Sequence, residues 1–151
     1  MTRGRPPKKA VKEALEPARG RGSVVELPDT SGLPCDLMIF SPSCIVFVKV
    51  KRMRAKVQGP PEVEIRYGSE VRALRVLPKS SAAVMELWIL SSHTMWQYFH
   101  ILSDTSVELR DDGTPLAGTG QSTGDCPAPP PACRSVPTPE DCALPAVLEG
   151  K

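Results

Sequence analysis

The most restrictive feature of this 151-residue sequence is the distribution of its prolines. Of 17 prolines, eight lie between Pro115 and Pro145, in a stretch that contains no aromatic residue. Such a stretch cannot bury enough apolar surface to offset the conformational entropy that is lost when its backbone is ordered. The sequence therefore predicts one folded domain over residues 8–110, preceded by a basic arm at 1–7 and followed by a disordered acidic tail at 111–151.

The charge of the chain is distributed as unevenly as its prolines. The formal net charge is only +2, but two segments differ strongly in charge. Residues 49–79 are basic, with nine Lys/Arg and three Glu, and residues 104–151 are acidic, with three Lys/Arg and eight Asp/Glu. A basic surface on a small domain favours nucleic acid over a membrane as partner, and DNA over RNA. A solvated lysine-rich surface without a polyanionic partner is the alternative that charge alone leaves open.

The hydropathy of the chain argues against a membrane partner. No segment has the roughly 20 consecutive apolar residues that a membrane-spanning helix needs. The basic N-terminus lacks the apolar stretch of a signal peptide. We therefore expect a cytoplasmic protein. The sequence does not set the oligomeric state, and a homodimer stays open.

Hydrophobic periodicity predicts the element order α-β-β-β-α-β-β-β, that is, an α/β domain whose sheet is flanked by helices. The clearest strand, residues 44–52, alternates between two faces, and a turn at 41–43 joins it to a strand at 35–40 in a hairpin. Other strands are expected at 23–27, 82–90, 94–102 and 107–110, and helices at 8–16, where Pro17 ends the helix, and at 62–77.

Charged residues lie at the ends of this hairpin. Asp36 opens its first strand, and Lys49 and Lys51 lie on one face near the end of the second. Residues two apart on a strand are roughly 6–7 Å apart, so the two ammonium groups repel. A carboxylate such as that of Asp36, or a phosphate, would relieve the repulsion. Alternatively, both lysines simply extend into water at the strand end.

The pattern formed by Pro34-Cys35-Asp36 and Lys49-Val50-Lys51 resembles the motif of the restriction-endonuclease-like PD-(D/E)XK superfamily. In that motif an Asp is followed, at the end of a strand, by an acidic residue, any residue and a Lys. In its order of elements over residues 8–110 the chain is similar to small archaeal Holliday-junction resolvases, related single-domain nucleases and short proteins of methanogenic archaea. The resemblance implies a small mixed sheet of the restriction-endonuclease-like fold, flanked by helices.

By this resemblance, Asp36 matches the first metal-binding carboxylate, Lys51 the motif lysine, and Glu13 a helix glutamate that some members use. Lys49 stands where the second carboxylate belongs, which puts an ammonium group where the charge of a Mg²⁺ ion would sit. The resemblance therefore implies a DNA-binding protein that is catalytically silent and needs no cofactor. In an active nuclease, Asp36 would be a Mg²⁺ ligand.

Two alternatives to silent DNA binding remain. One is an active Mg²⁺-dependent endonuclease or junction resolvase in which Glu13 or Glu86 completes the ligands, although a salt bridge or an exposed position is the simpler expectation for Glu86. The other is a protein-interaction module whose basic face binds an acidic partner. The arm before residue 8 resembles the Gly-Arg-Pro core of an AT-hook, which fits a narrow minor groove. The predicted DNA contacts are Lys49, Lys51, Arg52, Arg54 and Lys56 in the domain and Arg3 and Arg5 in the arm.

Overall fold

The computed structural model describes residues 8–91 and 95–116. The predicted contacts Arg3 and Arg5 and nearly all of the predicted tail lie outside the described residues. The elements, in chain order, are α1 (Lys8–Arg19), β1 (Ser23–Glu26), the 3-10 helix η1 (Asp29–Ser31), β2 (Leu37–Phe40), β3 (Ile45–Arg52), α2 (Pro60–Arg66), α3 (Gly68–Arg75), β4 (Ala83–Leu90), β5 (Trp96–Ile101) and β6 (Ser106–Leu109).

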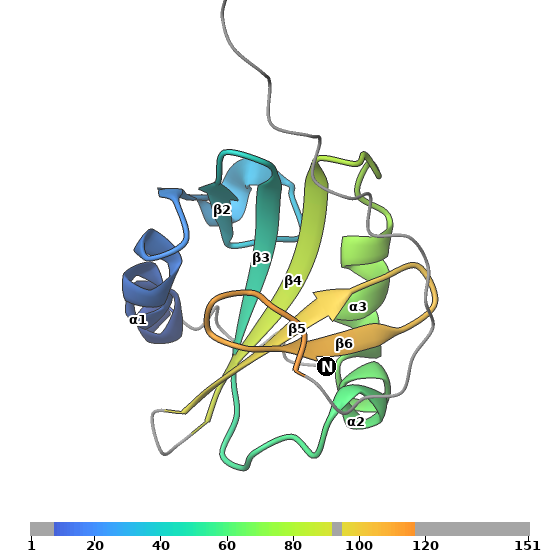
Figure 1. Cartoon of the computed structure of the whole chain (residues 1–151). Helices are drawn as coiled ribbons and strands as arrows, with labels where there is room; N and C mark the ends of the chain where they lie inside the picture. Colours follow the sequence, from blue (N-terminus) through green and yellow to red (C-terminus); the bar gives the residue numbers. More distant parts are fainter. Residues whose placement is uncertain (1–7, 92–94, 117–151) are drawn as a thin grey trace, which may run out of the picture. The chain divides into compact units, whose positions relative to one another are not determined.

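The six strands form one mixed sheet, in which they follow one another in chain order from β1 to β6 (Figure 1). β3 and β4 are parallel, and every other neighbouring pair is antiparallel. The parallel pair needs a crossover, which α2 and α3 supply. The predicted α/β class, with a mixed sheet flanked by helices, is therefore confirmed, and so is the hairpin of β2 and β3.

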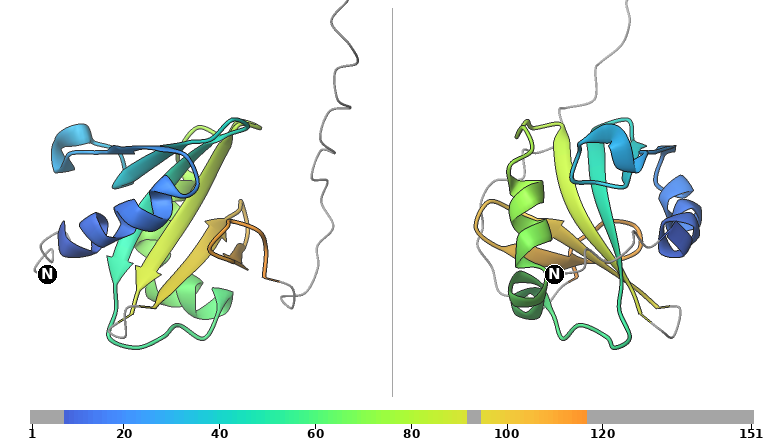
Figure 2. Two further views of the ribbon diagram at one scale, coloured as in Figure 1. Left: turned by 60° about the vertical axis from the view of Figure 1, so that its left-hand side comes forward. Right: turned by 180° about the vertical axis from the view of Figure 1, so that it is seen from behind.

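Helices cover both faces of the sheet: in the left-hand view of Figure 2, α1 lies in front of it and α2 and α3 lie behind it. The alternation of β3 assigns its residues to these two faces. Val46, Val48 and Val50 are buried in the cluster that includes the apolar side of α1. Phe47 packs against the other cluster, which contains Val71 and Leu74 of α3. Lys49 and Lys51 share the face of Phe47, so these two lysines lie on the side of α3.

The predicted boundaries of the helices, 8–16 and 62–77, are wrong in part. α1 continues through Pro17 to Arg19. Because Pro17 has no N–H, one helical hydrogen bond is lost in the last turn, and the helix ends two residues later. The expected single helix is two helices, because the backbone departs from helical geometry at Tyr67, with φ −115° and ψ 26°. The first of them begins at Pro60, where a proline is already preorganised for the first helical turn.

A buried ion pair holds the face of the sheet that α1 covers. Glu86 on β4 is 1% exposed. Its carboxylate accepts two hydrogen bonds from the guanidinium of Arg21, at 2.8 and 2.7 Å, and one from the indole N–H of Trp88, at 2.7 Å. The turn after β6 passes close to Arg21, since a Cβ added to Gly113 would lie 2.3 Å from a guanidinium nitrogen. The expected salt bridge of Glu86 is confirmed.

The helices do not have the character of membrane spans. Among residues 8–91 and 95–116, no helix is long and apolar enough to cross a bilayer.

Candidate nucleic-acid interface

Asp36 and Lys49 form an ion pair at the open end of the β2–β3 hairpin. The Lys49 ammonium donates to Oδ1 of Asp36 at 2.8 Å, and the backbone N–H of Val50 donates to Oδ2 at 2.7 Å. The backbone N–H of Asp36 in turn donates to the carbonyl of Val48. The side chain therefore continues the backbone ladder one step beyond the strand, and each oxygen of its carboxylate has a donor within the protein. The predicted approach of Asp36 to Lys49 is confirmed.

Lys51 does not join this pair. Its ammonium lies 2.5 Å from Oε1 of Glu70, in the first turn of α3, and the hydroxyl of Ser69 donates to the other oxygen at 2.6 Å. Although burial alone would raise the pKa of Glu70, the hydrogen bonds from Lys51 and Ser69 hold that pKa below its usual value. Glu70 is a site residue that the sequence reasoning did not identify.

The charges on this face of β3 are thus balanced by the protein itself. The lysines do not simply extend into water, since the side chains of Lys49 and Lys51 are 23% and 27% exposed. The carboxylates of Asp36 and Glu70 relieve the repulsion that was expected between them. Neither lysine therefore requires a phosphate to be stable where it lies.

The two glutamates considered as additional metal ligands lie elsewhere. Glu13 is on α1, which packs on the opposite face of the sheet, and its carboxylate is 3.9 Å from the ammonium of Lys9, one turn earlier. Glu86 is held by Arg21 on that same face. In the part of the chain that the structure describes, no three His, Cys, Asp or Glu side chains are grouped so that they could hold a metal ion.

The three remaining predicted contacts of the domain are exposed. Arg52 ends β3, and Arg54 and Lys56 follow it in the connection to α2. We call residues 52–56 the basic segment. Of the predicted contacts in the domain, those in the basic segment are the exposed ones.

A buried glutamine fastens the chain directly after the basic segment. The side chain of Gln97 on β5, in a residue only 4% exposed, accepts from the backbone N–H of Val57 at 2.8 Å and donates to its carbonyl at 2.9 Å. Val57 itself is 1% exposed. The pair of bonds imitates a step of a β-ladder and places the basic segment against the sheet. Gln97 was also missed by sequence reasoning, although a polar residue inside an apolar strand is a signal of such a role.

The comparisons with known proteins come from structure alone, because no protein-family model and no curated protein sequence matches the chain. Among solved structures, the chain is similar to Hjc from Archaeoglobus fulgidus, a Holliday junction resolvase from an archaeal hyperthermophile. The TM-score is 0.47 and the identity is 12%, over 66% of this chain and 85% of that one. A likeness of this size decides neither the family nor the activity of this chain.

The role of Asp36 in the fold can be tested by substitution. Asp36→Ala should lower the free energy of unfolding by about 1–3 kcal/mol, because it leaves the Val50 N–H and the Lys49 ammonium without their acceptor. Asp36→Asn keeps an oxygen for Val50 and should cost less. Urea denaturation measures both, with Asp104→Ala in the exposed β5–β6 turn as the control. Equal losses for the Ala and Asn variants would contradict the role of the Val50 bond.

Proposed function

We propose that this chain is a DNA-binding protein on a restriction-endonuclease-like scaffold and that it does not cleave the DNA it binds. The observation that carries the proposal is the ion pair of Asp36 and Lys49. In the superfamily that the hairpin motif resembles, the position of Lys49 belongs to a second carboxylate and the space between the two acids belongs to a metal ion. Here a lysine ammonium lies 2.8 Å from the remaining carboxylate.

The contacts of Asp36 support catalytic silence. Mg²⁺ requires oxygen ligands in near-ideal octahedral geometry, and both oxygens of Asp36 already accept hydrogen bonds from the protein. An ion would have to displace Lys49 and overcome its charge. The ammonium supplies one positive charge beside Asp36, but it cannot lower the pKa of a bound water as a divalent metal does. The motif lysine, Lys51, is also engaged, by Glu70.

The basic segment supports DNA binding. Its cations are exposed on a connection that Gln97 anchors. The backbone there is already ordered, so little conformational entropy is lost when the cations bind phosphates. Contacts of this kind position a protein on DNA without reading its sequence. We therefore expect binding with little sequence preference. Cytoplasmic localisation and homodimerisation remain predictions that accompany this proposal.

The salt dependence of DNA binding tests the proposal. With Arg52 and Lys56 exposed in the basic segment, the slope of log K against log salt should be about −2 or steeper, since each neutralised phosphate contributes about −0.9. Contacts from Arg3 and Arg5 would make the slope steeper. Lys56→Glu should weaken binding to every sequence and reduce the slope by about one. Lys79→Glu makes the same charge change in the turn before β4, at the opposite end of the parallel pair of β3 and β4, and serves as the control.

Cleavage assays complete the test. The purified protein should not cut duplex, single-stranded or four-way-junction DNA in the presence of Mg²⁺ or Mn²⁺. Metal-dependent cleavage that Asp36→Ala abolishes would establish an active nuclease instead. If no salt-sensitive binding occurs at low ionic strength, or if Lys56→Glu and Lys79→Glu weaken it equally, the basic segment is not a DNA contact, and a protein partner becomes the better explanation of the basic face.

A further inference from the structure

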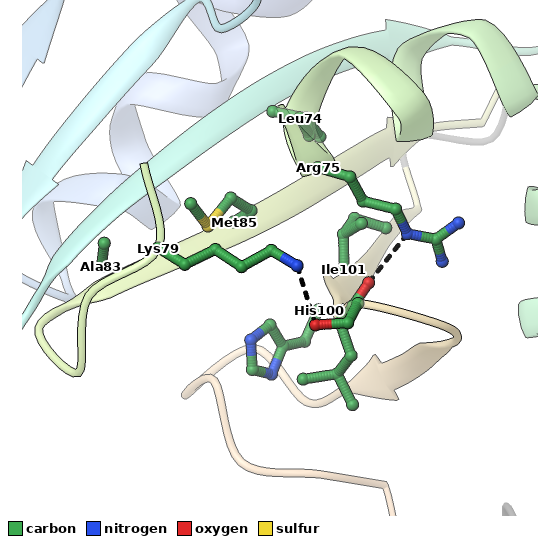
Figure 3. Close-up of a pocket in the computed structure, with 9 residues that line it drawn as sticks. Leu74, Arg75, Lys79, Ala83, Met85, His100 and Ile101 are labelled. Carbon is green, nitrogen blue, oxygen red and sulfur yellow. Dashed lines mark hydrogen bonds between the residues drawn. The ribbon is translucent and has the colours of Figure 1, made fainter. Parts of the chain in front are cut away.

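A cavity of about 160 Å³ lies at the end of the sheet opposite the basic segment. It is bounded by the end of α3, the start of β4 and the turn between β5 and β6 (Figure 3). Because β3 and β4 are parallel, the start of β4 and the end of β3 lie at opposite ends of the sheet. The cavity is therefore separate from the candidate DNA interface.

One side of the cavity is apolar. Leu74, Met85 and Ile101 line it and are 0%, 6% and 4% exposed. Leu102 also lines it, although this residue is 39% exposed. A partly exposed leucine beside buried apolar side chains is suited to contact with a hydrocarbon group.

Lys79 supplies a positive charge that no neighbouring carboxylate balances. Its ammonium donates to the hydroxyl of Ser103 at 2.9 Å (dashed in Figure 3), and the described residues include no salt bridge to it. An ammonium has three hydrogens, so two remain after this bond. The hydroxyl of Ser103 accepts from Lys79 and keeps its own proton for donation. Two polar groups beside the cavity can thus donate to an anion.

The other polar groups of the cavity add no net charge. Arg75 donates from Nε to the carbonyl of Leu102 at 2.8 Å and from Nη2 to Glu64 at 2.7 Å, so its charge is balanced and it holds the turn in place. The register of β4 and β5 sets His100 opposite Glu86, so its side chain lies on the face of α1, and burial lowers its pKa below the usual value. The lining as a whole has one positive charge in excess.

We propose that this cavity binds a small organic monoanion, a carboxylate on a short hydrocarbon chain. Its single negative charge matches Lys79, its oxygens match the donors of Lys79 and Ser103, and its chain matches the apolar side. A dianion such as phosphate fits less well, because the carbonyl end of α3 is nearby and carries partial negative charge. The volume of about 160 Å³ lies below the roughly 300–1,000 Å³ of pockets for drug-sized ligands, which favours a small ligand.

Butyrate is a suitable probe, and its binding to the full chain can be followed by NMR titration at neutral pH. Saturable binding with a dissociation constant of order millimolar is expected for a ligand of six heavy atoms. The amide signals of His100 and Ser103 should shift. Acetate, which lacks the chain, and inorganic phosphate should each bind at least about tenfold more weakly than butyrate.

Matched variants separate the two halves of the proposal. Lys79→Gln should weaken butyrate binding about tenfold or more, because a charged donor is lost. Lys56→Gln removes the same charge from the basic segment and should leave butyrate binding unchanged. Leu102→Asn keeps Lys79 and should reduce the preference for butyrate over acetate.

Three outcomes would overturn the proposal. They are no saturation by about 50 mM butyrate in the folded wild-type protein, tighter binding of phosphate than of butyrate, and equal weakening by Lys79→Gln and Lys56→Gln. The result is independent of the DNA-binding proposal, since Lys79→Gln should leave the salt slope of DNA binding unchanged.

Discussion

Replacing Arg21 with methionine should lower the free energy of unfolding by about 3–5 kcal/mol, because it leaves the carboxylate of Glu86 buried without its cation. Glu86 is 1% exposed and the side chain of Arg21 is 13% exposed, so water compensates little for the loss. Of the three donors to this carboxylate, only the indole of Trp88 would remain. Urea denaturation followed by tryptophan fluorescence measures the change, and Trp88 lies close enough to report it.

Two variants make this expectation specific. Arg19→Met removes the same charge from an exposed position at the end of α1 and should change stability by no more than about 0.5 kcal/mol. The double variant Arg21→Met/Glu86→Gln should recover much of the loss, because a neutral amide costs less to bury than a carboxylate. A loss for Arg21→Met no larger than that for Arg19→Met would show that the ion pair does not stabilise the fold.

The strands were predictable because their signals are local. The alternation of β3 assigns its valines to one face and its lysines to the other, and the short turn at 41–43 leaves an antiparallel hairpin as the natural pairing. The break at Tyr67 was not predictable in the same way. Val63, Val71 and Leu74 keep helical spacing across it and lie in the same buried cluster, so hydrophobic periodicity does not reveal the kink.

The sequence predicted that Asp36 lies near Lys49 or Lys51, and the register of the hairpin decides between them: Leu37 lies opposite Val48, which brings Asp36 and Lys49 together. The partners of Lys51, Glu86 and Val57 were not predictable. Arg21 and Glu86 are 65 residues apart, and Gln97 and Val57 are 40 apart. Such contacts depend on how helices and strands pack, and the sequence shows only that a polar residue in an apolar strand needs a partner.

The partner of Lys51 changes the number of cations available to DNA. The sequence reasoning counted five in the domain, but Asp36 and Glu70 each neutralise one of them. In the proposed function, each such pairing lowers the number of phosphates that the domain can neutralise, so the salt slope should be shallower than the value of about −4.5 that five cations would give.

Lys49→Glu should convert the ion pair into a metal-responsive site. Without metal, two repelling carboxylates would replace an attractive ion pair, and the free energy of unfolding should fall by about 2–4 kcal/mol. The loss is smaller than the Coulomb energy of an unscreened pair because both side chains are partly exposed to water. Millimolar Mn²⁺ or Mg²⁺ should restore much of it, because the ion takes the place of the ammonium between two acids. Thermal denaturation measures this: the midpoint of the variant should rise with metal concentration, and that of the wild type should not.

The controls separate metal binding from a change of charge. Lys49→Gln removes the ammonium without adding a carboxylate and should show no metal-dependent rise, and Lys12→Glu reverses a charge on the exposed side of α1 with the same expectation. Adding Asp36→Asn to Lys49→Glu should abolish the rise. Because Lys51 stays bound to Glu70, metal binding alone should give little cleavage, and Lys49→Glu/Glu70→Gln should cleave more than Lys49→Glu. An equal metal-dependent rise in the wild type would mean that Lys49 does not block the metal position, and the case for catalytic silence would fail with it.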